Sequence, residues 1–111
     1  MDERIGKFQV TFNEEKDYVA CHHISRDMLL NAEEKHVAKT LATLSALAEQ
    51  VMKERWAGYH KLYQKIHEQL NEQDDFPFDK EDLRTQLENL NDRVNKGELI
   101  EEIPLQLKRT G

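Results

Sequence analysis

Two short segments bring potential metal ligands close together in the sequence, Cys21-His22-His23 and Glu33-x-x-His36. Neighbouring side chains of a strand point to opposite faces, so Cys21 and His23 could share a metal ion whereas His22 could not join them. A zinc site needs four ligands, or three and a water molecule. We therefore expect Cys21 to be a small buried thiol and its neighbours to be surface histidines.

The second segment has the spacing that di-iron carboxylate bundles use to place two ligands on one helix face. Such bundles need the motif twice, with two further glutamates, and Glu33-x-x-His36 occurs once. The chain also has no glycine-rich phosphate loop and no local serine or cysteine nucleophile signature. We expect a protein that is not an enzyme and has no catalytic residues, metal or cofactor. A metal-binding protein or enzyme is the less favoured alternative.

Negative charge is concentrated in one part of the chain. The window from Glu68 to Asp82 holds seven acidic residues and one lysine, and its charge of −6 equals the net charge of the whole chain. Nucleic-acid binding requires a basic face, so direct contact with nucleic acid is not expected. Stacking of single-stranded nucleic acid on aromatic residues beside the lysines near Trp56 is a further alternative. The acidic window instead favours a protein partner with a basic surface.

The turn over residues 71–79 combines these acids with two aromatic residues. Aromatic anchors commonly dominate binding energy, while complementary charge raises the association rate. The residues predicted to contact the partner are Asp74, Asp75, Phe76, Phe78 and Asp79. In the alternative interpretation, Phe78 packs against the helix that follows and Phe76 covers the end of a helical hairpin.

A long helix is predicted over residues 31–70, which contain no proline and one glycine. Its start is set by a capping box from Asn31 to Glu34, or alternatively lies at Ser25. At about 1.5 Å per residue the helix would be about 60 Å long, whereas a domain of this size has a radius of gyration of about 13 Å. Either the helix breaks at Ala57-Gly58, or a second copy of the chain covers it. We favour the second copy, a homodimer.

A second helix is predicted over residues 80–95 and packs antiparallel on the first. Asp79 has the position of an N-cap, and Gly97 follows where a C-terminal cap is expected. Leucines recur at helical spacing between them. The residues predicted to pack the helices or the dimer are Leu44, Met52, Trp56, Tyr59, Tyr63 and Leu87.

Alternating apolar residues predict β-structure at both ends of the chain. Phe8, Val10 and Phe12 favour a β-hairpin over residues 5–24, and a tail over residues 98–109 alternates again as an edge strand or tail. A rival interpretation leads the first strand directly into a helix from Asn13, as in ribbon-helix-helix proteins, although acids crowd that turn. The expected fold is a single α+β domain, mainly α, in which a helical hairpin carries a small antiparallel sheet.

The sequence contains no secretory signal and no membrane-spanning run, and its lone Cys21 suits a reducing compartment. We expect a cytoplasmic regulator or interaction module that is homodimeric and binds a basic partner surface through the acidic turn. The alternative is a small acidic inhibitor of the mobile-element type, which blocks a nucleic-acid-binding site.

Overall fold

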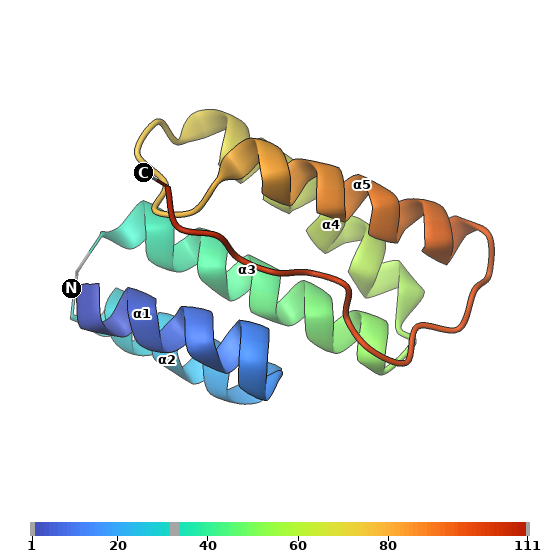
Figure 1. Ribbon diagram of the computed structural model, residues 1–111, viewed down its shortest axis with the longest axis horizontal. Helices are drawn as coiled ribbons and strands as arrows, with labels where there is room; N and C mark the ends of the chain where they lie inside the picture. Colours follow the sequence, from blue (N-terminus) through green and yellow to red (C-terminus); the bar gives the residue numbers. More distant parts are fainter. Residues whose placement is uncertain (1, 32–33, 111) are drawn as a thin grey trace.

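A computed structural model of the chain describes residues 2–31 and 34–110, which form helices and one extended tail (Figure 1). The helices are α1 (Asp2–Val10), the π-helix η1 (Thr11–Glu15), α2 (Tyr18–Leu30), α3 (Lys35–Met52), α4 (Trp56–Glu72) and α5 (Lys80–Asn95). In these two ranges β-pairing is limited to one bridge, between Phe78 and Arg109. The predicted α+β fold with a small sheet is therefore wrong, and the chain is all-helical.

The helices form two layers. α2, α3 and α4 lie side by side in the more distant layer of Figure 1, where α3 packs against both neighbours. α1 lies in front of α2, α5 lies in front of α4, and the tail after α5 runs between them across α3. The molecule measures 38 × 25 × 23 Å, with a radius of gyration of 13.1 Å. The core lies between the layers.

The segment predicted as a β-hairpin is helical. Ile5, Phe8 and Phe12 are buried at intervals of three and four residues, which is the spacing of one helix face. Val10, which completes the alternating pattern, is 45% exposed. The rings of Phe8 and Phe12 stack with centroids 5.9 Å apart. The rival strand from residue 5 with a helix from Asn13 is also wrong, because α1 is already helical.

The helix predicted over residues 31–70 is two helices, α3 and α4, and its N-terminal boundary is also wrong. The chain turns at residues 53–55, where Glu54 has a φ of 54°, so that α4 packs back against α3. The alternative break at Ala57-Gly58 lies inside α4. Asn31 ends α2 instead of beginning a helix, and Ser25 lies within α2. With the helix folded in two, its length no longer requires a second copy.

The helix predicted over residues 80–95 is confirmed as α5. The Asp79 carboxylate accepts a hydrogen bond from the Asp82 N–H at 3.0 Å, as an N-cap does. Gly97 has a φ of 73°, and the next amide, that of Glu98, donates to the Arg93 carbonyl at 3.1 Å. This is the Schellman ending that a glycine at this position allows.

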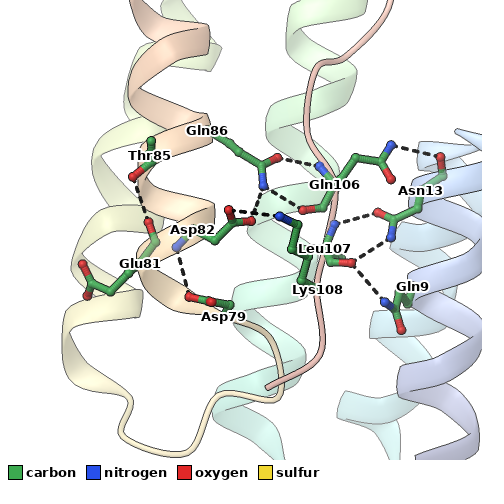
Figure 2. A network of polar contacts seen from close by, with 10 residues as sticks. All are labelled: Gln9, Asn13, Asp79, Glu81, Asp82, Thr85, Gln86, Gln106, Leu107 and Lys108. Carbon is green, nitrogen blue, oxygen red and sulfur yellow. Dashed lines mark hydrogen bonds and ion pairs between the residues drawn. The ribbon is translucent and has the colours of Figure 1, made fainter. Parts of the chain in front are cut away.

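The tail is extended as predicted, but it pairs with side chains instead of a strand (Figure 2). On one side, Asn13 Nδ2 donates to the Leu107 carbonyl at 2.9 Å and the Leu107 N–H donates to Asn13 Oδ1 at 2.7 Å. On the other, Gln86 Nε2 donates to the Gln106 carbonyl at 3.0 Å, and the Gln106 N–H donates to Gln86 Oε1 at 2.6 Å. The buried tail residues are Ile100, Ile103, Leu105 and Leu107. The side-chain amides of Asn13 and Gln86 thus form the backbone hydrogen bonds that a partner strand would otherwise supply to an extended segment.

Candidate functional site

The acidic loop, defined as residues 73–79, connects α4 to α5 and alternates buried with exposed side chains. Gln73 is 7% exposed, Phe76 is 4% exposed and Phe78 is fully buried. The two phenylalanine rings meet edge to face with centroids 5.8 Å apart. Asp74 and Asp75, between Gln73 and Phe76, are exposed. The loop therefore presents carboxylates outward, while both aromatic rings predicted to touch a partner point into the core.

The last residues of the tail hold the loop in place. The Asp79 N–H donates to the Lys108 carbonyl at 2.8 Å, and the Thr110 N–H donates to the Pro77 carbonyl at 3.1 Å. The Arg109 guanidinium lies 5.9 Å from the centre of the Phe78 ring, within the range of a cation–π contact. These contacts fix the backbone from which the carboxylates project.

A polar cleft of about 740 Å³ lies beside the loop, between the first turns of α3 and the end of α4. Its floor includes Gln73, whose Nε2 donates to the Thr40 hydroxyl oxygen and to the Gln69 carbonyl. Within the described chain, the side-chain oxygens Gln73 Oε1 and Gln69 Oε1 are buried without a hydrogen-bond partner. The cleft wall on α3 carries His36 and Lys39.

Three exposed carboxylates line the opposite wall of this cleft, those of Glu72, Asp74 and Asp75. In the part of the chain that the structure describes, none of the three forms an ion pair.

The other acids of the loop and of the first turn of α5 form a helix cap or ion pairs. Asp79 caps α5, Asp82 lies 3.5 Å from the Lys108 ammonium, and Glu81 pairs with Arg84. Among these acids, the three that form neither an ion pair nor a helix cap in the described part of the chain thus lie at the cleft, opposite Lys39.

The segments considered as metal ligands do not come together. Glu33 lies outside the described residues, and His36 is exposed at the cleft. The predicted burial of Cys21 is confirmed; burial first, and then the Asp17 and Glu15 carboxylates, raise the pKa of its thiol to about 12. Over residues 2–31 and 34–110, no three histidine, cysteine, aspartate or glutamate side chains are grouped to hold a metal ion.

The residues predicted to pack the helices are distributed between core and surface. Leu44, Tyr59 and Leu87 are fully buried. The Tyr59 hydroxyl donates to Asn91 Oδ1 at 2.9 Å and links α4 to α5, and burial raises the pKa of this phenol above its ordinary value. The partly exposed members of the set are Met52, Trp56 and Tyr63.

Glu72 and Gln73 were not among the residues predicted from the sequence to contact a partner. Glu72 lies four residues after Glu68 at the end of α4. Helix periodicity could therefore have indicated that Glu72 lies next to the loop. The burial of Gln73 depends on Thr40, a residue of another helix, and no local pattern indicates it.

Protein families, curated proteins and solved structures offer no match to this chain. Among the described residues, no helix combines the length and the apolar character needed to cross a membrane.

Proposed function

We propose that this chain is a non-enzymatic interaction module that binds a basic surface of another protein through its acidic loop. The observation that carries the proposal is the set of three exposed carboxylates, Glu72, Asp74 and Asp75, which line one cleft and form no ion pair in the described chain. A lysine or arginine side chain of a partner would supply the missing counter-charge.

The loop is suited to this role because its backbone is already ordered. Buried Gln73, Phe76 and Phe78 anchor it from within, and the tail holds it from outside. A binding surface that is ordered in advance loses less conformational entropy when it binds. Exposed carboxylates also accelerate encounter with a basic surface, and this effect weakens with salt.

In this proposal the two phenylalanines support the loop, and the carboxylates make the contact. A homodimer is not required for the proposal, because α3 and α4 cover one another. The free thiol of Cys21 suits the reducing environment of the cytoplasm, which is the compartment we propose.

The test compares affinity capture by three forms of the chain from a lysate of the cells that produce it. The loop variant carries Glu72→Gln, Asp74→Asn and Asp75→Asn. The control variant carries Glu14→Gln, Glu15→Gln and Glu101→Gln, which remove the same charge from exposed positions away from the cleft. We expect the wild type and the control to retain proteins with basic surfaces that the loop variant loses.

Equal capture by all three forms would contradict the proposal, as would equal losses in both variants, which would indicate an effect of net charge alone. A DNA oligonucleotide added as competitor tests the inhibitor alternative. Displacement of the captured proteins by DNA would favour a mimic of nucleic acid, whereas an ordinary interaction module retains them.

A further inference from the structure

A second surface, on the outer face of α3, has properties opposite to those of the acidic loop. The residues that line the outer groove include Leu29 of α2, Lys39, Ala42 and Ala46 of α3, and Leu62 and Lys65 of α4, and the remaining lining residues are the polar His22, Thr43 and Gln69. It encloses about 530 Å³.

This groove lies on the side of α3 that faces away from the tail. Lys39, Ala42 and Ala46 recur at intervals of three and four residues and share one face of the helix. The face on the other side of α3, with Leu44 and Val51, is buried in the core, and there the tail crosses the helix (Figure 1).

The groove fits the side of a helix. Its floor is made of alanines, whose small side chains let a neighbouring backbone approach closely, and helix axes pack about 8 to 10 Å apart depending on the side chains in contact. Leu29 and Leu62 form apolar walls and are partly buried against the core. From Lys39 to Ala46 the floor extends about 10 Å along α3, or two helical turns, at about 1.5 Å per residue.

An extended segment does not fit this groove in the same way. The tail is extended on the core side of α3 because Asn13 and Gln86 supply hydrogen bonds to its backbone (Figure 2). Among the lining residues of the outer groove, Gln69 is the one side-chain amide. An extended guest would therefore leave most of its backbone groups unpaired, whereas a helix satisfies its own.

The charge of the groove defines the guest further. Lys39 and Lys65 form no ion pair in the described chain, and no lining residue of the groove is an aspartate or glutamate. This is a basic strip on a chain with a net charge of −6. Its ammonium groups attract carboxylates, and they repel a basic segment of the kind proposed for the acidic loop.

We propose that the outer groove binds an acidic amphipathic helix of a partner protein. The guest places an apolar stripe, with residues at i, i+3 or i+4 and i+7, on Ala42 and Ala46 between the two leucines. Its carboxylates flank the stripe and pair with Lys39 and Lys65. The groove shares Lys39 and Gln69 with the cleft beside the acidic loop, but the proposal does not rest on the function proposed for that loop.

The experiment uses the full chain as bait for a displayed library of random peptides. Binders of the wild type are counter-selected against Ala46→Glu, which fills the floor of the groove and adds a carboxylate. Ala57→Glu is the matched control, since Ala57 is an exposed alanine of α4 outside the groove. Circular dichroism verifies that each variant is folded. We expect the enriched peptides to combine a helical apolar stripe with flanking aspartates and glutamates.

A second measurement does not depend on the alanine variants. The most enriched peptide is synthesised with a fluorescent label, and its affinity is measured for Lys65→Glu and for Lys61→Glu, the latter being an exposed lysine of the same helix outside the groove. Reversing one contacting charge replaces attraction by repulsion, so Lys65→Glu should weaken binding by about tenfold and Lys61→Glu by less than about twofold.

Three results would overturn the proposal. In the first, no enriched peptide binds the wild type and Ala57→Glu but fails to bind Ala46→Glu. Another is enrichment of basic peptides, or of peptides without an apolar stripe. The third is equal weakening by Lys65→Glu and Lys61→Glu. A dimer of the wild type that Ala46→Glu dissociates in sedimentation would assign the groove to a second copy of the chain, which also contradicts the proposal.

Discussion

Asn13 and Leu107, which are 94 residues apart in the sequence, exchange two hydrogen bonds as opposite residues of a β-ladder do. The Asn13 amide donates to the Leu107 carbonyl and accepts from the Leu107 N–H. One side chain of the N-terminal region thus forms the two hydrogen bonds with the C-terminal tail that a residue of a paired strand would form.

Replacing Asn13 with alanine should therefore loosen the tail. Each of the two hydrogen bonds contributes about 1 kcal/mol, so we expect Asn13→Ala to lower the free energy of unfolding by about 2 kcal/mol. Urea unfolding measures the loss, and hydrogen exchange should show that the Leu107 amide loses its protection. Glu14→Ala is the control, because Glu14 is an exposed neighbour in η1. An unchanged unfolding midpoint would show that the two Asn13 hydrogen bonds do not stabilise the tail.

Removing the Phe76 ring should destabilise the fold. From the sequence we expected this side chain to contact a partner, and truncation of a surface anchor leaves folding intact. At 4% exposure, Phe76→Ala instead leaves a cavity beside Phe78, at a cost of about 3 kcal/mol or more. Thermal unfolding of Phe76→Ala and of Asp75→Ala, its exposed neighbour, makes the comparison. Equal melting temperatures for the two variants would indicate that the Phe76 ring is not packed in the core.

A charge at the centre of α5 should unfold the chain. Leu87 is fully buried, and an aspartate there would lose its hydration without gaining a counter-ion. We expect Leu87→Asp to lose cooperative melting, since the lost packing alone costs about 2 to 5 kcal/mol of a typical total of about 5 to 15 kcal/mol. Asn89→Asp adds the same charge at an exposed position of α5 and should melt as the wild type does. Cooperative melting of Leu87→Asp would mean that α5 does not pack as described.

Stability should fall in alkali. Burial raises the pKa of the Cys21 thiol from 9.0 to about 12, so the folded state holds the thiol proton more tightly than the unfolded state does. The contribution is complete below about pH 9 and disappears as the pH rises to about 12. Tyr18 contributes in the same direction, because burial raises its pKa from 10.0 to about 12.

Urea midpoints at about pH 8 and about pH 11 test this dependence. Cys21→Ala should show a smaller decrease between the two pH values than the wild type, because it lacks one of the groups that titrate. An equal decrease in both proteins would assign the alkaline loss to the tyrosines alone.

The sequence was most informative where local signals agree with one another. In α5 the cap at Asp79, the leucine spacing and the glycine at position 97 all indicate the same boundaries, and the structure has them. The tail was predicted to be extended, and its buried residues alternate accordingly. Its pairing with Asn13 and Gln86 was not foreseeable, because amide side chains carry no pattern that marks them as substitutes for a strand.

The failures arise where one pattern fits two structures. Phe8 and Phe12 fit a strand when Val10 is counted with them, and they fit a helix when Ile5 is. Only the packing of α1 against α2 decides between these interpretations. The break at residues 53–55 contains no proline or glycine, and the apolar stripe continues on both sides of it. The sequence therefore did not indicate a break there. In the acidic loop the carboxylates were identified from composition, whereas the burial of Phe76 depends on tertiary contacts that the sequence does not show.

The pairing of Asn13 with Leu107 also sets an order of events during synthesis. A ribosome releases the amides of α1 and η1 long before it adds the residue that binds them, so these groups stay hydrated while α2 to α5 emerge. The tail cannot take its place across α3 until translation has passed position 107. A nascent chain that stalls earlier would leave the apolar face of α3 that the tail crosses open to chaperones and proteases.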